Sequence, residues 1–270
     1  MYSLYLECAE SEAEMLSSDL WEEGACGIQE EALPGARCLL RAWFEDPAGL
    51  LQRFPEYQPR LEADPDIDWE TASRQAWEPF DVGRRLHLAP EWDENPTPRG
   101  RLRLTIHPGL ALGTGAHPAT QLCLEALEKH LRAGETVLDV GAGSGILMAA
   151  SILLGARHAA GCDIEYDSIA VARRNLIADA LPPHVFAGST RAIRSLSVDV
   201  LVANINAVTH QTLAGEYARI ARRALILSGF PDRHEARLLE CFPALGFSVV
   251  DTLSRNEWVC SVLCKNEETS

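Results

Sequence analysis

Three glycines lie close together where a predicted strand becomes a predicted helix. Gly141, Gly143 and Gly145 occur in DVGAGSG, between the apolar run TVLDVG and the apolar stretch ILMAASILLGA. Because glycine has no side chain, a ligand can approach the backbone closely at such a junction. The dinucleotide fingerprint G-x-G-x-x-G would need glycine where the chain has Ile146. The spacing predicts a nucleotide-type site, and a simple tight turn is the alternative.

An aspartate and a serine end the next two predicted strands. Asp163 follows HAAGC, 22 residues after Gly141, where a carboxylate can accept hydrogen bonds from both hydroxyls of a ribose. The alternative is that Asp163 caps the helix that starts near Asp167. Ser189 ends the third strand, where it could approach the edge of an adenine or serve only as a turn residue. These residues extend the predicted nucleotide site.

Asn204 ends the apolar run VDVLVANI. It therefore lies at the carboxyl end of a fourth predicted strand, where α/β sheets place reactive groups. Its amide oxygen could accept a hydrogen bond from a substrate amine. Adenine and glutamine methyltransferases have Asn or Asp followed by two prolines and an aromatic residue here, whereas this chain has Asn204-Ile205-Asn206. A flexible amine therefore fits better than a flat base or amide.

Upstream of the glycines, the segment GLALGTGAHPAT, residues 109–120, is rich in glycine and hydroxyl groups and could fold over a cofactor. His117 within it could act as a general base or could order its own loop, and a lone loop histidine more often does the latter. The eight histidines form no HxxxH or HxH spacing and the eight cysteines no CxxC pair. We therefore expect no metal site.

The remaining pattern shows how these residues would be positioned. From about residue 101, strand-like and helix-like stretches alternate, which predicts a parallel sheet with helices on both faces. The tail, FSVVDTL followed by WVCSVLCK, predicts a terminal antiparallel hairpin. The carboxyl ends of parallel strands share one edge of a sheet, so the predicted site residues should lie together.

The first 60 residues have a different pattern, which predicts a strand, a helix, two strands and a second helix. Period-two alternation in YSLYLEC predicts the first strand. Ser11 with Glu14 forms a capping-box pattern for the first helix, and Asp46 with Pro47 is typical of the start of the second. Residues 58–100 contain many prolines and acids and predict a connector, with Trp69, Trp77 and Trp92 packing it onto a domain.

The chain is strongly acidic, and its charge is unevenly distributed along the sequence. The net charge is −15, and residues 1–80 hold 18 Asp and Glu residues against 5 arginines, a net charge of −13. Such a field opposes general binding to a phosphate backbone and favours a basic partner, with solubility alone as the alternative. No run of 18 apolar residues occurs, and the first residues carry acids where a secretory signal would carry positive charge. We expect a cytoplasmic protein without membrane attachment.

Taken together, these motifs resemble the ribosomal protein L11 methyltransferase family (PrmA). The resemblance runs over nearly the whole chain and includes VGRRLHLAPEW, GTGAHPAT, LDVGAGSGIL, GCDIEYDSI, VANI and EWVCSVL. It implies a class I methyltransferase, an α/β fold with a Rossmann-like doubly wound sheet and a terminal antiparallel hairpin. It also implies a small N-terminal α+β ferredoxin-like domain that recognises the substrate. The expected division is residues 1–60 for recognition, 61–100 as linker and 101–270 for catalysis.

The resemblance also implies roles for individual residues. Thr120 matches the family's cofactor-contacting threonine, Gly141 its first loop glycine, Asp163 its ribose carboxylate and Asn204 its strand-four asparagine. The expected cofactor-binding set is Thr120, Gly141, Gly143, Gly145, Asp163, Ser189 and Asn204, with Asn204 also catalytic. The chain departs from the family at Ala119, where a threonine is usual, in a missing Pro-Gly-Gly before the fifth strand, and within NINAVTH.

The implied reaction transfers methyl groups from S-adenosylmethionine to lysine ε-amines and the N-terminal α-amine of a basic ribosomal protein. It requires alignment and a neutral amine rather than many catalytic side chains. We expect a monomer that needs no direct contact with nucleic acid. The alternatives are a methyltransferase of the same fold acting on another protein, such as an electron-transfer flavoprotein subunit, and a non-catalytic ribosome-associated binding protein. A nicotinamide-dependent oxidoreductase is disfavoured by Ile146.

Overall fold

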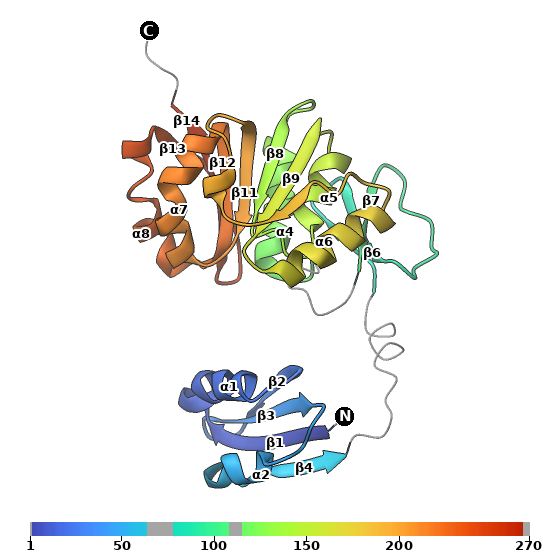
Figure 1. The fold of residues 1–270 in the computed structure, drawn as a ribbon, viewed down its shortest axis with the longest axis vertical. Coiled ribbons are helices and arrows are strands. Elements are labelled where there is room, and N and C mark those ends of the chain that lie inside the picture. The colour runs from blue at the N-terminus through green and yellow to red at the C-terminus, as the bar shows by residue number, and fades with distance from the viewer. Residues whose placement is uncertain (1, 64–77, 108–114, 267–270) are drawn as a thin grey trace. The chain divides into compact units, whose positions relative to one another are not determined.

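The computed structural model describes residues 2–63, 78–107 and 115–266, and the chain separates into two units, residues 1–75 and 76–270 (Figure 1). Each unit has its own core. No helix in the described part of the chain is long and apolar enough to cross a membrane.

The first unit is a four-stranded antiparallel sheet with two helices. The strand order is β2-β3-β1-β4, and the chain order βαββαβ is that of a ferredoxin-like fold. Leu4, Leu6 and Cys8 alternate into the core and pack with Leu16 and Leu20 of the first helix. The elements are β1 Tyr2–Ala9, η1 Glu10–Glu12, α1 Ala13–Glu22, β2 Gly27–Leu33, β3 Arg37–Phe44, α2 Leu50–Arg53, η2 Pro55–Tyr57 and β4 Arg60–Ala63.

Both helix starts predicted for this unit are wrong in detail. Helix α1 begins at Ala13 without a side-chain cap, and it is the Glu12 carboxylate that accepts a hydrogen bond, 3.2 Å long, from the Ala9 N–H. Ser11 therefore does not cap the helix. The Asp46 carboxylate accepts a hydrogen bond from the Ala48 N–H, but α2 begins only at Leu50. Glu12 satisfies the start of the 3-10 turn η1, and Asp46 satisfies a turn that precedes α2.

Part of the expected connector is folded. β4 completes the first sheet, and residues 80–90 form two strands that join a third in a separate sheet of the second unit, ordered β5-β6-β7. Trp69 and Trp77 lie outside the described residues. The functional division at residues 60 and 100 stays a prediction. The three strands are β5 Phe80–Val82, β6 Leu86–Pro90 and β7 Leu102–Ile106.

The main sheet of the second unit has seven strands in the order β10-β9-β8-β11-β12-β14-β13. The first five run parallel, and the terminal hairpin β13–β14 pairs antiparallel with β12, as the sequence predicts. The strands are β8 Thr136–Val140, β9 His158–Asp163, β10 Val185–Ala187, β11 Val198–Asn204, β12 Ala221–Pro231, β13 Phe247–Arg255 and β14 Trp258–Lys265.

Helices cover both faces of this sheet, so its central strands are buried on both sides. In β11, Val200 and Val202 pack into one core with α4, α5 and α6, while Leu201 and Ala203 pack into the other with α7 and α8. This explains the continuous apolar runs. The helices are α4 Pro118–His130, α5 Ile146–Leu153, α6 Tyr166–Ala178, α7 Ala207–Ile220 and α8 Glu235–Leu239, with 3-10 turns η3 Thr190–Ala192, η4 Asp232–His234 and η5 Pro243–Leu245.

Candidate functional site

The three glycines form the turn between β8 and α5, and all have left-handed backbone conformations. The φ angles of Gly141, Gly143 and Gly145 are +77°, +51° and +83°, a region that L side chains rarely adopt. Space is limiting at Gly141 as well, because a Cβ there would lie 2.6 Å from Cγ2 of Ile205. The turn itself therefore requires glycine, and its role in ligand binding stays a prediction.

Asp163 ends β9, the neighbour of β8, and its carboxylate holds the glycine turn. Oδ2 accepts a hydrogen bond from the Gly143 N–H and Oδ1 accepts one from the Glu165 N–H, each 3.0 Å long. Helix α6 begins at Tyr166 with Glu165 as its N-cap, so Asp163 is not the cap considered above. Each carboxylate oxygen keeps a second lone pair that a ligand hydroxyl could use.

Asn204 ends β11 and donates a hydrogen bond to another predicted site residue. Its Nδ2 lies 3.0 Å from Oγ1 of Thr120, which is 2 % exposed in the first turn of α4. With Nδ2 engaged by Thr120, Oδ1 is left as the acceptor of the amide. Gly229 of β12 packs closely here, because a Cβ would lie 2.8 Å from Asn204 Oδ1 and 2.5 Å from the backbone N and O of Ile205.

The Asp163–Gly143 and Asn204–Thr120 hydrogen bonds both lie near the glycine turn. Ile205 follows Asn204 in the chain, and its side chain approaches Gly141. Ser189 is exposed on the next strand connection, directly after Gly188, whose N–H donates to the backbone oxygen of Asp163 at 2.8 Å. The Ser189 side chain makes no capping bond to the turn that follows. The structure therefore brings the predicted residues to one sheet edge, with Ser189 at its periphery.

Asp139, two residues before Gly141, is a buried carboxyl group that the sequence analysis did not single out. It is 1 % exposed, and neither carboxyl oxygen has a hydrogen-bond partner in the described part of the chain. Burial, and then the nearby negative charge of Asp163, raises the pKa of Asp139 well above its ordinary value. The signal in the sequence is a charged residue inside the apolar run TVLDVG.

His117 orders its own loop. Its Nδ1 accepts a hydrogen bond from the Ala119 N–H at 3.2 Å, so His117 is the N-cap of α4. Its ring meets the Trp258 ring edge-on, with centroids 4.5 Å apart. Burial lowers the pKa of His117, against the opposing charge of Glu257. Residues 109–114 of the segment expected to fold over the cofactor lie outside the described residues.

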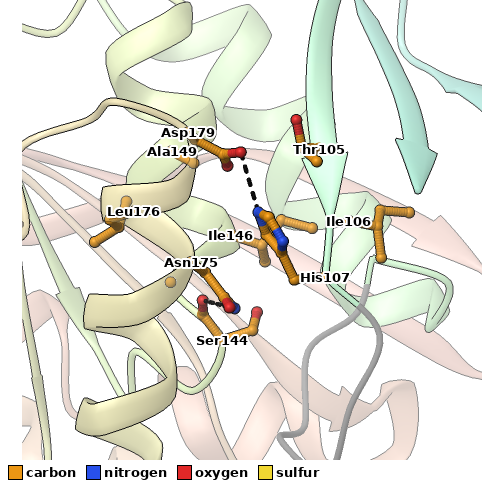
Figure 2. A pocket seen from close by; sticks show the side chains of 10 residues that line it. Thr105, Ile106, His107, Ser144, Ile146, Ala149, Asn175, Leu176 and Asp179 are labelled. Carbon is orange, nitrogen blue, oxygen red and sulfur yellow. Dashed lines mark hydrogen bonds and ion pairs between the residues drawn. The ribbon is translucent and has the colours of Figure 1, made fainter. Parts of the chain in front are cut away.

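A small hollow borders the glycine turn at Ser144 and Gly145 (Figure 2). His107, at the end of β7, lies between two carboxylates: Nδ1 is 2.9 Å from Glu91 and Nε2 is 3.0 Å from Asp179, which follows α6. The hydrogen bond to Asp179 is the largest cause of the raised pKa of His107. Asn175 Nδ2 donates to the Ser144 carbonyl oxygen at 3.0 Å. Of these side chains, Asn175 bonds to the turn directly, and no sequence pattern identified any of them.

Residues 46–266 match the family model for "Ribosomal protein L11 methyltransferase (PrmA)". A protein of that name from Geobacter metallireducens is 36% identical over 82% of this chain and 80% of its own length. Another from Gloeobacter violaceus is 35% identical over 90% of this chain and 80% of its own.

A solved structure agrees with this match. The crystal structure of a ribosomal protein L11 methylase from Lactobacillus delbrueckii superimposes with a TM-score of 0.66 at 25% sequence identity. The superposition covers 71% of this chain and 100% of that chain. The similarity therefore extends to the arrangement of the sheet and the helices.

Proposed function

Because this chain belongs to the ribosomal protein L11 methyltransferase (PrmA) family, whose members are S-adenosylmethionine-dependent protein methyltransferases, we propose that it methylates ribosomal protein L11. The acceptors would be lysine ε-amines and the N-terminal α-amine. The observation that carries the proposal is the family match over residues 46–266, which includes the whole of the site described above. We expect the reaction to take place in the cytoplasm.

The residues at the sheet edge fit S-adenosylmethionine. The turn has glycine at positions 141, 143 and 145, so a ligand can approach its backbone closely. The Asp163 carboxylate, fixed by two backbone N–H groups, has lone pairs for the two ribose hydroxyls. Ile164, 77 % exposed, provides an apolar surface beside it for the flat base, with Ser189 near its edge. The cofactor supplies a methyl group bound to a positively charged sulfur. A correctly aligned neutral amine can accept this methyl group.

The side chains near Asn204 would prepare the amine. Thr120 fixes the Asn204 amide, so that Oδ1 can accept a hydrogen bond from the incoming amine and align its lone pair. A lysine has an ordinary pKa of about 10.4 and must lose its proton before it can react. Desolvation at the site would favour the neutral form. No side chain is then needed as a strong base, which agrees with the capping role of His117.

The acidic charge of the first unit favours a basic protein as the substrate. Most of the net charge of −15 belongs to the first 80 residues, and an acidic field accelerates encounters with a basic protein. This charge would concentrate the substrate near the enzyme, while contacts at the sheet edge would select the amine.

A labelling experiment tests the proposal. The purified protein is incubated with isotope-labelled S-adenosylmethionine and L11 from a strain that lacks this methylation, and mass spectrometry locates the label. We expect label on lysine side chains and on the N-terminal amine of L11. If the protein binds S-adenosylmethionine but leaves L11 unlabelled, the proposed substrate is wrong.

A further inference from the structure

A hollow of about 350 Å³ lies beside the proposed amine site, and its rim carries basic side chains. We call it the basic groove. Its walls come from the first turns of α7, from the end of β12 between Gly229 and Pro231, and from η4 and α8. Arg233, His234 and Arg237 supply the basic groups. This volume is in the range of binding pockets for small ligands or for a few side chains.

The basic groove adjoins Asn204. Gly229, which lines the groove, lies so close to Asn204 that a Cβ there would be 2.8 Å from its Oδ1. Asn206, two residues after Asn204, lines the groove as well and caps α7 by accepting a hydrogen bond from the Thr209 N–H. A chain whose amine reaches Asn204 could therefore place neighbouring residues in the groove.

The basic side chains of the groove are not neutralised within the described part of the chain. Arg233 and Arg237 are exposed, and no carboxylate pairs with their guanidinium groups. The adjacent acids are engaged elsewhere, because Asp232 accepts from the Arg233 backbone N–H and Glu235 accepts from the hydroxyls of Thr252 and Ser261.

Some arginines of this unit have carboxylate partners, in pairs such as Arg219–Glu216, Arg222–Asp199 and Arg223–Glu135. What distinguishes Arg233 and Arg237 is their position, because both line one hollow in a chain of net charge −15. An anionic ligand would suit this hollow, because guanidinium groups bind carboxylates through paired, charge-assisted hydrogen bonds.

We propose that the basic groove binds an acidic side chain of the methylated protein, close in sequence to the target amine. The inference rests on the proposed function and adds a rule of substrate choice. A basic ribosomal protein offers many lysines, and a required carboxylate next to the target would distinguish one lysine from the rest. Val208, 73 % exposed, provides an apolar contact for the stem of the same side chain. The acidic charge of the chain as a whole argues against RNA as the occupant.

The test uses the full-length enzyme with Arg233→Gln and Arg237→Gln combined, and unmethylated L11 as substrate. We expect KM for L11 to rise about tenfold, since charge-assisted hydrogen bonds are lost, while the Kd for S-adenosylmethionine and kcat stay unchanged. Arg157→Gln is the matched control. Arg157 is exposed, and it directly precedes His158 at the opposite end of β9 from Asp163, so we expect its substitution to leave KM unchanged.

L11 variants then identify the acidic group. Each Asp or Glu within four positions of a methylated lysine is replaced singly by Asn or Gln. One replacement should raise KM with the wild-type enzyme and have no further effect with the double variant, as expected for two partners in one contact. If the double variant has an unchanged KM for L11, the groove inference alone is overturned. The same holds if the double variant binds a ribosomal RNA fragment more weakly than the wild type but keeps its KM for L11. A wild-type enzyme that leaves L11 unmethylated would overturn the proposed function and this inference together.

Discussion

At the level of single residues, two carboxyl groups near the glycine turn have contrasting environments. Asp163 accepts two backbone hydrogen bonds, so its carboxylate is held in a fixed orientation. Asp139 is buried, and its oxygens have no partner in the described residues. A carboxyl group in such surroundings favours the protonated form. The same type of side chain therefore occupies two different environments beside one turn.

The raised pKa of Asp139 predicts that the stability of the folded protein depends on pH. A carboxyl whose pKa is higher in the folded protein stabilises the fold below its unfolded pKa, and this contribution is lost as pH rises through the folded pKa. The Asp139→Asn variant lacks this dependence. The difference in Tm, variant minus wild type, should therefore increase from pH 5 to pH 8 in thermal unfolding. A constant difference over that range would show that Asp139 is ionised in the folded protein.

At the level of elements, the packing of β12 against Ile205, which follows β11, depends on Gly229. Its φ is +93°, and a Cβ would meet the backbone of Ile205 at 2.5 Å. We expect Gly229→Ala to destabilise the protein by at least about 2 kcal/mol, through overpacking and backbone strain. Gly215→Ala is a matched control in α7, where a Cβ would meet nothing within 4 Å. That change should stabilise by about 0.5–1 kcal/mol. Denaturant unfolding measures both, and equal effects would refute the packing argument.

His107 joins β7 to the end of α6 through Asp179, and this contact depends on pH. Because the pKa of His107 is raised above its ordinary value of 6.5, its contribution to stability is complete below that value. The contribution is lost as pH rises through the folded pKa. The Tm difference between wild type and His107→Gln should therefore be largest near pH 6 and small at pH 9. His184→Gln, at an exposed position, is the control; the same pH trend in that variant would contradict the assignment to His107.

The elements also show what the sequence could predict. Period-two and apolar patterns located β1 to β3 and the strands of the seven-stranded sheet, because burial on one or two faces dictates those patterns. They missed β4, β5 and β6, which lie in the expected connector. Exact helix starts failed at Ser11 and Asp46, since nearby turns compete for the same side chains. The Thr120–Asn204 contact joins residues 84 positions apart, and the basic groove combines two separate segments, residues 206–211 and 229–237. Such contacts depend on tertiary packing, which no local pattern records.

At the level of the whole molecule, the charge is divided between the two units. Residues 1–80 carry most of the net charge of −15, whereas the basic groove belongs to the second unit. If the acidic unit attracts the substrate over a distance, salt should weaken that attraction. Raising NaCl from about 0.05 M to about 0.5 M should increase KM for L11 by about 5- to 10-fold. The Kd for S-adenosylmethionine should change little. A KM that does not depend on salt would exclude long-range steering.

The most direct test of the account is to measure cofactor binding and single-turnover methyl transfer to L11 in the same two variants, Asn204→Ala and Asp163→Ala. The account predicts that Asn204→Ala weakens S-adenosylmethionine binding less than Asp163→Ala does, but transfers methyl groups about 100-fold more slowly at saturating cofactor, because the amine loses its alignment. Asp163→Ala should weaken cofactor binding about 10- to 100-fold, because charge-assisted hydrogen bonds are lost. Full transfer activity in Asn204→Ala would contradict the account.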